Sequence, residues 1–271
     1  MASFTGSALK DVYKDILHTS NSNTGLSTTI KQITCGDGDG TSLYLSNRNA
    51  KIQPSADSTT NTVIYDKDGN ALVTVDSTND LVKAGIGQHT VNTQYKQFGM
   101  FDFTPAAGSH YQMITTPIMY ESAVWADAVN GSVWGGNGTN PSTSLTIANN
   151  SLNFIPCVWL LQQNITIDEV QYILSAEGST TVNVHVMSYS MVTGSGSTAG
   201  DLTSGVVLAQ TGTSSAEGDL SPITTAAERV SNGTLTINTP NVDSRQAILV
   251  FAEASDTDDM TVQVNIKYHL R

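Results

Sequence analysis

The stretch "MTVQVNIKYHL", residues 260–270, alternates strictly between apolar and polar side chains. Residues two apart in a β-strand point to the same face of a sheet. The two faces are therefore Val262, Val264, Ile266, Tyr268 and Leu270 on one side, and Gln263, Asn265, Lys267 and His269 on the other. This pattern predicts an antiparallel strand that buries one face in a core and turns the other toward solvent.

Six stretches upstream of this strand have a similar character. They are "LNFIPCVWLL" (152–161), "ITIDEVQYIL" (165–174), "TTVNVHVMSYSM" (180–191), "GVVLAQT" (205–211), "GTLTINT" (233–239) and "QAILVFAEA" (246–254). Loops rich in Gly, Ser and Asp connect them. Many strands at such spacing predict an all-β fold, with a jelly-roll-like antiparallel β-sandwich over residues 98–271.

Residues 25–97 have shorter strands and more turns. In "NTVIYDKDGNALVTVD" (61–76), two runs rich in β-branched residues flank "DKDGN", whose Asp, Gly and Asn tolerate the positive φ of tight hairpins. A calcium loop that began at Asp66 would need Gly at its sixth position and Glu at its twelfth, where this chain has Ala71 and Ser77. We therefore expect a β-hairpin.

The strands of residues 25–97 contain too few apolar side chains to bury a core within one copy. We therefore expect this segment to be a β stalk that intertwines with identical copies. The run "CGDGDG" (35–40) lacks the lysine and the following helix of a phosphate-binding loop, and we expect another turn there.

Residues 7–18 are expected to form a short amphipathic helix, within an N-terminal segment that spans residues 1–24. Apolar residues recur there at intervals of three and four, which places them on one helical face: Leu9, Val12, Tyr13, Ile16 and Leu17. A helix this short needs a partner to bury such a stripe. We expect these five residues to dock on another protein.

Composition excludes several functions. The chain has 12 Lys and Arg against 24 Asp and Glu and has no basic cluster, so nucleic-acid binding is not expected. The N-terminus lacks the pattern of a secretory signal, and no apolar run is long enough to span a bilayer, so we expect a product made in the cytoplasm without membrane insertion. Cys35 and Cys157 lie far apart, with neither disulfide nor zinc-site spacing.

The chain contains no recognisable catalytic motif, and we expect no enzyme activity, metal or cofactor. His185 and His269 fall on the polar faces of predicted strands, where we expect them to be exposed. Asp168 and Glu169 are adjacent and would point to opposite faces of a strand, so they cannot act as a glycosidase pair. The acidic run "ASDTDDM" (254–260) is expected to be a solvated turn and not a calcium site.

The loop "YESAVWADAVNGSVWGGNGTNPSTS" (120–144) is the best candidate for ligand binding. Its two tryptophans, Trp125 and Trp134, lie among Gly, Asn and Ser. An exposed tryptophan beside amide side chains can stack on a sugar and hydrogen-bond its hydroxyls. Alternatively both rings are buried, as tryptophans in proteins usually are.

The opening "LKDVYKDILHTSNSNTG", the segment "RNAKIQPSADSTTNTVIYDKDGNALVTVDSTNDLVKAGIGQ" and the strands "QAILVFAEA" and "VQVNIKYHLR" resemble the fibre-like virion proteins of tailed, particularly marine, bacteriophages. The resemblance covers the first hundred residues in sequence and the remainder in architecture. It implies a homotrimer in the virion that docks on the phage capsid or tail by its N-terminus and meets host-surface glycan with its β head.

A chain of 271 residues is short for a tail fibre. A capsid head fibre or a decoration (cement) protein is therefore a structural alternative, and a small polysaccharide depolymerase is an enzymatic one.

Overall fold

The computed structural model describes residues 17–19, 25–115, 135, 138–146, 157–212 and 222–271. It divides the chain into two compact units, Met1–Val91 and Asn92–Arg271. The second unit begins six residues before the expected start at Phe98, because strand β9 already pairs with β20 from Thr93 onward. Within the described residues no helix has the length and apolar character needed to cross a membrane.

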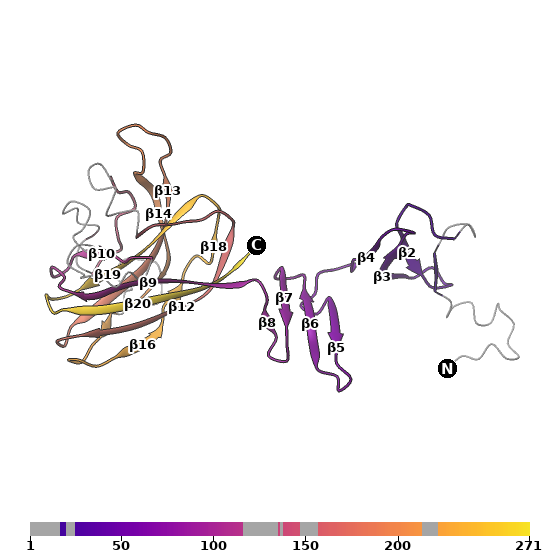
Figure 1. Ribbon diagram of the computed structural model, residues 1–271, viewed down its shortest axis with the longest axis horizontal. Coiled ribbons are helices and arrows are strands. Elements are labelled where there is room, and N and C mark those ends of the chain that lie inside the picture. The colour runs from indigo at the N-terminus through magenta and orange to yellow at the C-terminus, as the bar shows by residue number, and fades with distance from the viewer. Residues whose placement is uncertain (1–16, 20–24, 116–134, 136–137, 147–156, 213–221) are drawn as a thin grey trace, which may run out of the picture. The chain divides into compact units, whose positions relative to one another are not determined.

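The first unit contains two antiparallel four-stranded sheets with sequential strand order (Figure 1). One consists of β1 (His18–Thr19), β2 (Lys31–Thr34), β3 (Gly40–Leu45) and β4 (Ala50–Ile52). The other consists of β5 (Thr62–Tyr65), β6 (Ala71–Asp76), β7 (Leu81–Ala84) and β8 (His89–Thr90). Most connections are tight turns, because short strands follow each other directly in sequence.

The run "DKDGN" is the turn between β5 and β6, as expected. The Asp66 carboxylate accepts hydrogen bonds of 2.8 Å from the backbone N–H groups of Asp68 and Asn70. Gly69 has a φ of 85°, a conformation that favours glycine. The carboxylate of Asp66 therefore stabilises the turn itself, and the hairpin prediction is confirmed.

The second unit is built around a larger and a smaller antiparallel sheet (Figure 1). The seven-stranded sheet has the order β10 (His110–Gln112), β19 (Gln246–Ala254), β13 (Thr181–Met191), β14 (Leu202–Gln210) and β17 (Thr236–Ile237). Off this path, β11 (Trp159–Leu160) pairs with β19, and β15 (Ile223–Thr224) pairs with β13.

The five-stranded sheet has the order β16 (Ser231–Thr234), β12 (Ile165–Ala176), β20 (Met260–Leu270) and β9 (Thr93–Phe103), and β18 (Asn241–Val242) pairs with β12. Its inward side chains and those of the seven-stranded sheet form one core. Phe98, Val170, Val184, Val250 and Val264 are fully buried members of it. The all-β prediction, with an antiparallel sandwich in the C-terminal part, is confirmed.

The predicted N-terminal helix lies almost entirely outside the described residues. Its expected last residue, His18, belongs instead to strand β1, where it pairs with Thr34 of β2. The helix therefore cannot extend to His18, because the backbone of His18 is part of a β-sheet.

Candidate functional site

The central strands β13 and β19 of the seven-stranded sheet are buried on both faces. The inner face of this sheet packs in the sandwich core, and its outer face forms a second apolar cluster: Leu145, Met187, Tyr189, Leu202, Val207, Ala247, Leu249 and Phe251. Residues 138–146 form part of the cover over this outer face. Tyr189 donates a hydrogen bond from its hydroxyl to the Ser142 carbonyl (2.9 Å), and Leu145 forms a β-bridge with Leu202.

Polar side chains lie on the same outer face, at the end of the strands next to the apolar cluster. Strand pairing places His110, Glu253 and Asn183 in one cross-strand row and Gln112, Phe251, His185 and Gln210 in the next row. All six polar residues of these rows are buried. We call them the buried polar cluster.

Glu253 is the best-bonded member of the buried polar cluster. Its carboxylate accepts one hydrogen bond of 2.9 Å from the Asn183 amide and another of 2.9 Å from the backbone N–H of Gly138. Thr211 donates in turn to the Asn183 side-chain oxygen (3.2 Å). The Gly138 bond therefore ties the covering segment to the sheet through a buried carboxylate.

The two histidines of the cluster lie next to each other. Their ring centroids are 5.3 Å apart, and His110 Nε2 is 3.9 Å from Glu253 Oε2, which is too far for a hydrogen bond. Neither ring nitrogen of His185 has a hydrogen-bond partner in the described part of the chain. The side chains of Gln112 and Gln210 are equally unpartnered among those residues.

This environment favours the neutral form of both histidines. Burial lowers the pKa of His185 to about 3, with a smaller contribution from neighbouring His110. Burial also lowers the pKa of His110, although Glu253 and the backbone at Gly135 and Thr139 act in the opposite direction. A neighbouring carboxylate raises the pKa of His110, whereas none raises the pKa of His185.

The prediction that His185 and His269 are exposed was wrong. His185 is fully buried, because a further layer of chain covers the outer face of its sheet. His269 is buried because β12 has a bulge between Ile167 and Glu169, from which the Asp168 carboxylate contacts His269 Nδ1 at 2.8 Å. Neither the covering layer nor the bulge leaves a periodic signal in these strands.

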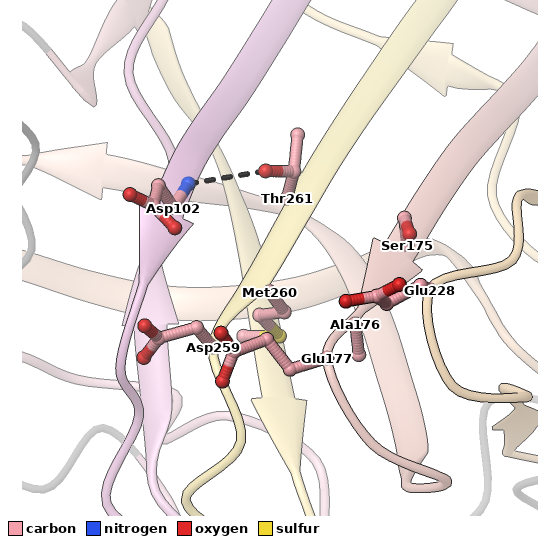
Figure 2. Close-up of a pocket in the computed structure, with 8 residues that line it drawn as sticks. All are labelled: Asp102, Ser175, Ala176, Glu177, Glu228, Asp259, Met260 and Thr261. Carbon is pink, nitrogen blue, oxygen red and sulfur yellow. Dashed lines mark hydrogen bonds between the residues drawn. The ribbon is translucent and has the colours of Figure 1, made fainter.

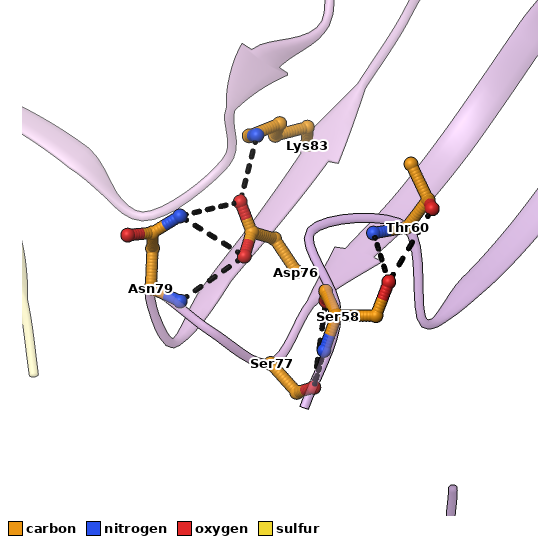
Figure 3. A network of polar contacts seen from close by, with 6 residues as sticks. All are labelled: Ser58, Thr60, Asp76, Ser77, Asn79 and Lys83. Atoms are coloured by element: carbon orange, nitrogen blue, oxygen red, sulfur yellow. Dashed lines mark hydrogen bonds and ion pairs between the residues drawn. The ribbon is translucent and has the colours of Figure 1, made fainter. Parts of the chain in front are cut away.

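A polar network in the first unit surrounds Asp76 at the end of β6 (Figure 3). The Asp76 carboxylate accepts hydrogen bonds from the backbone and side-chain amides of Asn79 (3.0 to 3.1 Å) and from Lys83 Nζ (2.9 Å). The side-chain bond from Asn79, followed by that from Lys83, lowers the pKa of Asp76 to about 2. The network closes the turn between β6 and β7.

A pocket of about 180 Å³ lies where β9, β12 and β20 meet the loops of the second unit (Figure 2). Its lining includes four acidic residues: Asp102, Glu177, Glu228 and Asp259. Thr104 donates a hydrogen bond to Asp259, and the Asp102 N–H donates to Thr261 Oγ1 (3.0 Å). Among the described residues, no three or more His, Cys, Asp or Glu side chains are arranged to hold a metal ion.

Most of the predicted site residues lie outside the described residues. This holds for Leu9, Val12, Tyr13 and Ile16 of the docking stripe and for Trp125 and Trp134 of the glycan-binding loop. Leu17 is described and is 63% exposed. Both cysteines are free, and burial raises the pKa of the Cys157 thiol to about 12.

The β5–β8 sheet has an uncovered apolar face. Residues directly paired across strands share a face, and the pairs Ile64–Val73, Val73–Ala84 and Val75–Val82 place these side chains together. Ile64 is 56% exposed and Val82 is 39% exposed. We call this surface the stalk face.

The β1–β4 sheet has a smaller exposed apolar pair. Leu43 pairs with Ile52 across β3 and β4, and both side chains are exposed. Among the described hydrophobic residues of the first unit, only Ile33 is buried. A single copy of this unit therefore has almost no apolar core.

No known protein family and no curated protein matches the sequence. Among solved structures, an aminopeptidase from the marine sediment archaeon Thaumarchaeota archaeon is 10% identical, over 73% of this chain and 40% of that chain, with a TM-score of 0.27. An α-amino acid ester hydrolase is 9% identical, over 65% of this chain and 32% of that chain, with a TM-score of 0.23.

Desmodium yellow mottle tymovirus is 8% identical, over 66% of this chain and 86% of that chain, with a TM-score of 0.18. The chain spans less than half the length of the aminopeptidase and of the ester hydrolase. Similarities with TM-scores this low give no information about function.

Proposed function

We propose that this protein is a non-enzymatic structural fibre of a phage virion, which assembles as a homotrimer through its first unit. The stalk face is the observation that carries the proposal. Ile64 and Val82 lie in hydrogen-bonded strands and yet are exposed in one copy. Exposed apolar side chains gathered on one face of a sheet are typical of protein–protein contacts.

A second copy of the chain is the occupant that the stalk face fits best. The face is uncharged, and its small and β-branched residues suit packing against an identical sheet. A four-stranded sheet with one uncovered face gains little stability alone, because sheets need an opposing layer to bury their apolar side. Three copies around an axis would supply that layer, as the resemblance to phage fibres implies.

The remaining parts of the chain have complementary roles in this proposal. The N-terminus docks on the capsid or tail through five apolar residues: Leu9, Val12, Tyr13, Ile16 and Leu17. The second unit is a stable sandwich that faces outward and meets host-surface glycan, for which Trp125 and Trp134 are the proposed contacts.

Two measurements test the proposal. Multi-angle light scattering of the purified full chain should give three times the mass of one copy, and a folded, concentration-independent monomer would reject the trimer. Immunogold labelling of intact phage particles that carry the gene should place the protein on the virion. Label on the tail supports a tail fibre, label on the capsid supports a head fibre or decoration protein, and absence from particles rejects a virion role.

A further inference from the structure

Residues 138–146 are attached to the outer face of the seven-stranded sheet differently at their two ends. At one end, Leu145 and Leu202 exchange two backbone hydrogen bonds of 2.8 Å within an apolar cluster. At the other end, the backbone N–H of Gly138 donates to the buried Glu253 carboxylate (2.9 Å). The second attachment depends on the charge state of the side chains beneath it.

Those side chains come from every strand that packs against this end. His110 belongs to β10, Glu253 to β19 and His185 to β13, while the β14 residue at this position is the neutral Gln210. Residues 138–146 contain no titratable side chain. In the described structure the charge of this end is therefore set by two histidines and one glutamate.

A proton on His185 cannot be accommodated while the cover is closed. The ring is fully buried, and its nitrogens have no hydrogen-bond partner among the described residues. Its titratable neighbour is another histidine, with 5.3 Å between ring centroids. A charged group buried without a partner is strongly disfavoured, whereas an opened cover would let water solvate the imidazolium.

We propose that His110, His185 and Glu253 form an acid-sensitive latch, which holds residues 138–146 on the sheet at neutral pH and releases their Gly138 end in mild acid. Glu253 supplies the bond that closes the latch. His185 is the residue whose protonation opens it, and His110 adds to the effect once its own ring is charged. This inference does not depend on the proposed fibre function, because it concerns contacts within one copy.

The expected effect of pH on the opening of the latch follows from proton linkage. The ordinary pKa of a histidine is 6.5, whereas closure lowers that of His185 to about 3, so the open state binds one more proton over the interval between them. Between pH 7.5 and 5.5 the opening constant should therefore rise about tenfold if His185 alone takes up a proton. If His110 takes up a proton as well, the rise is larger.

Native-state hydrogen exchange of the full chain measures this opening. The protection factor of the Gly138 amide, which is corrected for the intrinsic pH dependence of exchange, should fall about tenfold or more between pH 7.5 and 5.5. The Val264 amide, in the core of the five-stranded sheet, should keep its protection. A constant Gly138 protection factor, or a parallel loss at Val264, would overturn the proposal, because the second result means global unfolding.

Substitutions identify the residue responsible. His185→Gln keeps a polar side chain that cannot titrate, and it should remove most of the pH dependence at Gly138. His269→Gln, in the other sheet, is the matched control and should leave it unchanged. If the His185 variant does not fold, NMR titration of the His185 imidazole in the wild-type protein replaces it. The proposal requires His185 to remain neutral at pH 5.5 in the closed state. A titration of His185 near pH 6.5 would refute the proposal.

Discussion

Replacing Ile64 by Ala should weaken the proposed trimer strongly and leave the second unit unaffected. Ile64 is 56% exposed in one copy and shares the stalk face with Val73 and Ala84. Full burial of an Ile side chain contributes about 1.5 to 3 kcal/mol, so covering the exposed part contributes about 1 kcal/mol per copy after allowing for the Ala that remains. Three copies give about 3 kcal/mol per trimer, or about a hundredfold in its dissociation constant.

Sedimentation equilibrium over a range of concentrations measures this change, and Val63→Ala is the matched control. Val63 neighbours Ile64 on β5 and pairs with Thr74, so it lies on the opposite face of the sheet, where it is half-buried. The control should retain the wild-type dissociation constant. If both variants weaken assembly equally, or if neither does, the stalk face is not the interface.

Three further predictions concern the other parts of the chain. Because its folded pKa is lowered, Asp76 stabilises the β5–β8 sheet above its unfolded pKa of 3.8, and this contribution is lost as the pH falls toward about 2. NMR signals of β6 should therefore show acid destabilisation in that window, and Asp76→Asn should abolish it. Trp125→Ala or Trp134→Ala should weaken cell adsorption by about 1 to 3 kcal/mol at nearly constant melting temperature if the ring contacts glycan; destabilisation by about 3 to 5 kcal/mol without a specific adsorption defect would instead show burial. Deleting residues 1–17 should preserve the trimer but prevent incorporation into particles, and an unassembled variant would show that this segment stabilises the stalk.

Side-chain alternation predicted the strands of the sandwich closely. The stretch 260–270 coincides with β20, and 165–174 lies within β12. Alternation works there because each strand has one inner face whose side chains must all be apolar, as Val262, Val264 and Ile266 are. The turn at Asp66 was equally predictable, because its residues are those that positive φ and local carboxylate bonds require.

The covered outer face of the seven-stranded sheet was not predicted, and neither was the buried polar cluster. In β13 every residue from Val182 to Tyr189 is buried, although the polar side chains of Asn183 and His185 suggested a solvent-facing side. One signal was present in the neighbouring strand: "QAILVFAEA" is apolar on both faces, which indicates cover on both. Part of the cover is the irregular segment 138–146, whose composition resembles that of an ordinary loop.

The two units differ in opposite ways from the usual pattern of buried apolar and exposed polar side chains. The second unit buries polar groups because another part of the same chain covers them, so its properties can be tested in one copy. The first unit exposes apolar groups on a sheet face that no described residue of the same copy covers, and further copies of the chain are the cover that we propose. The number of copies does not follow from the stalk face, since a dimer would also cover it. A stable dimer would therefore retain the interface and reject the phage-fibre resemblance, which alone implies threefold assembly.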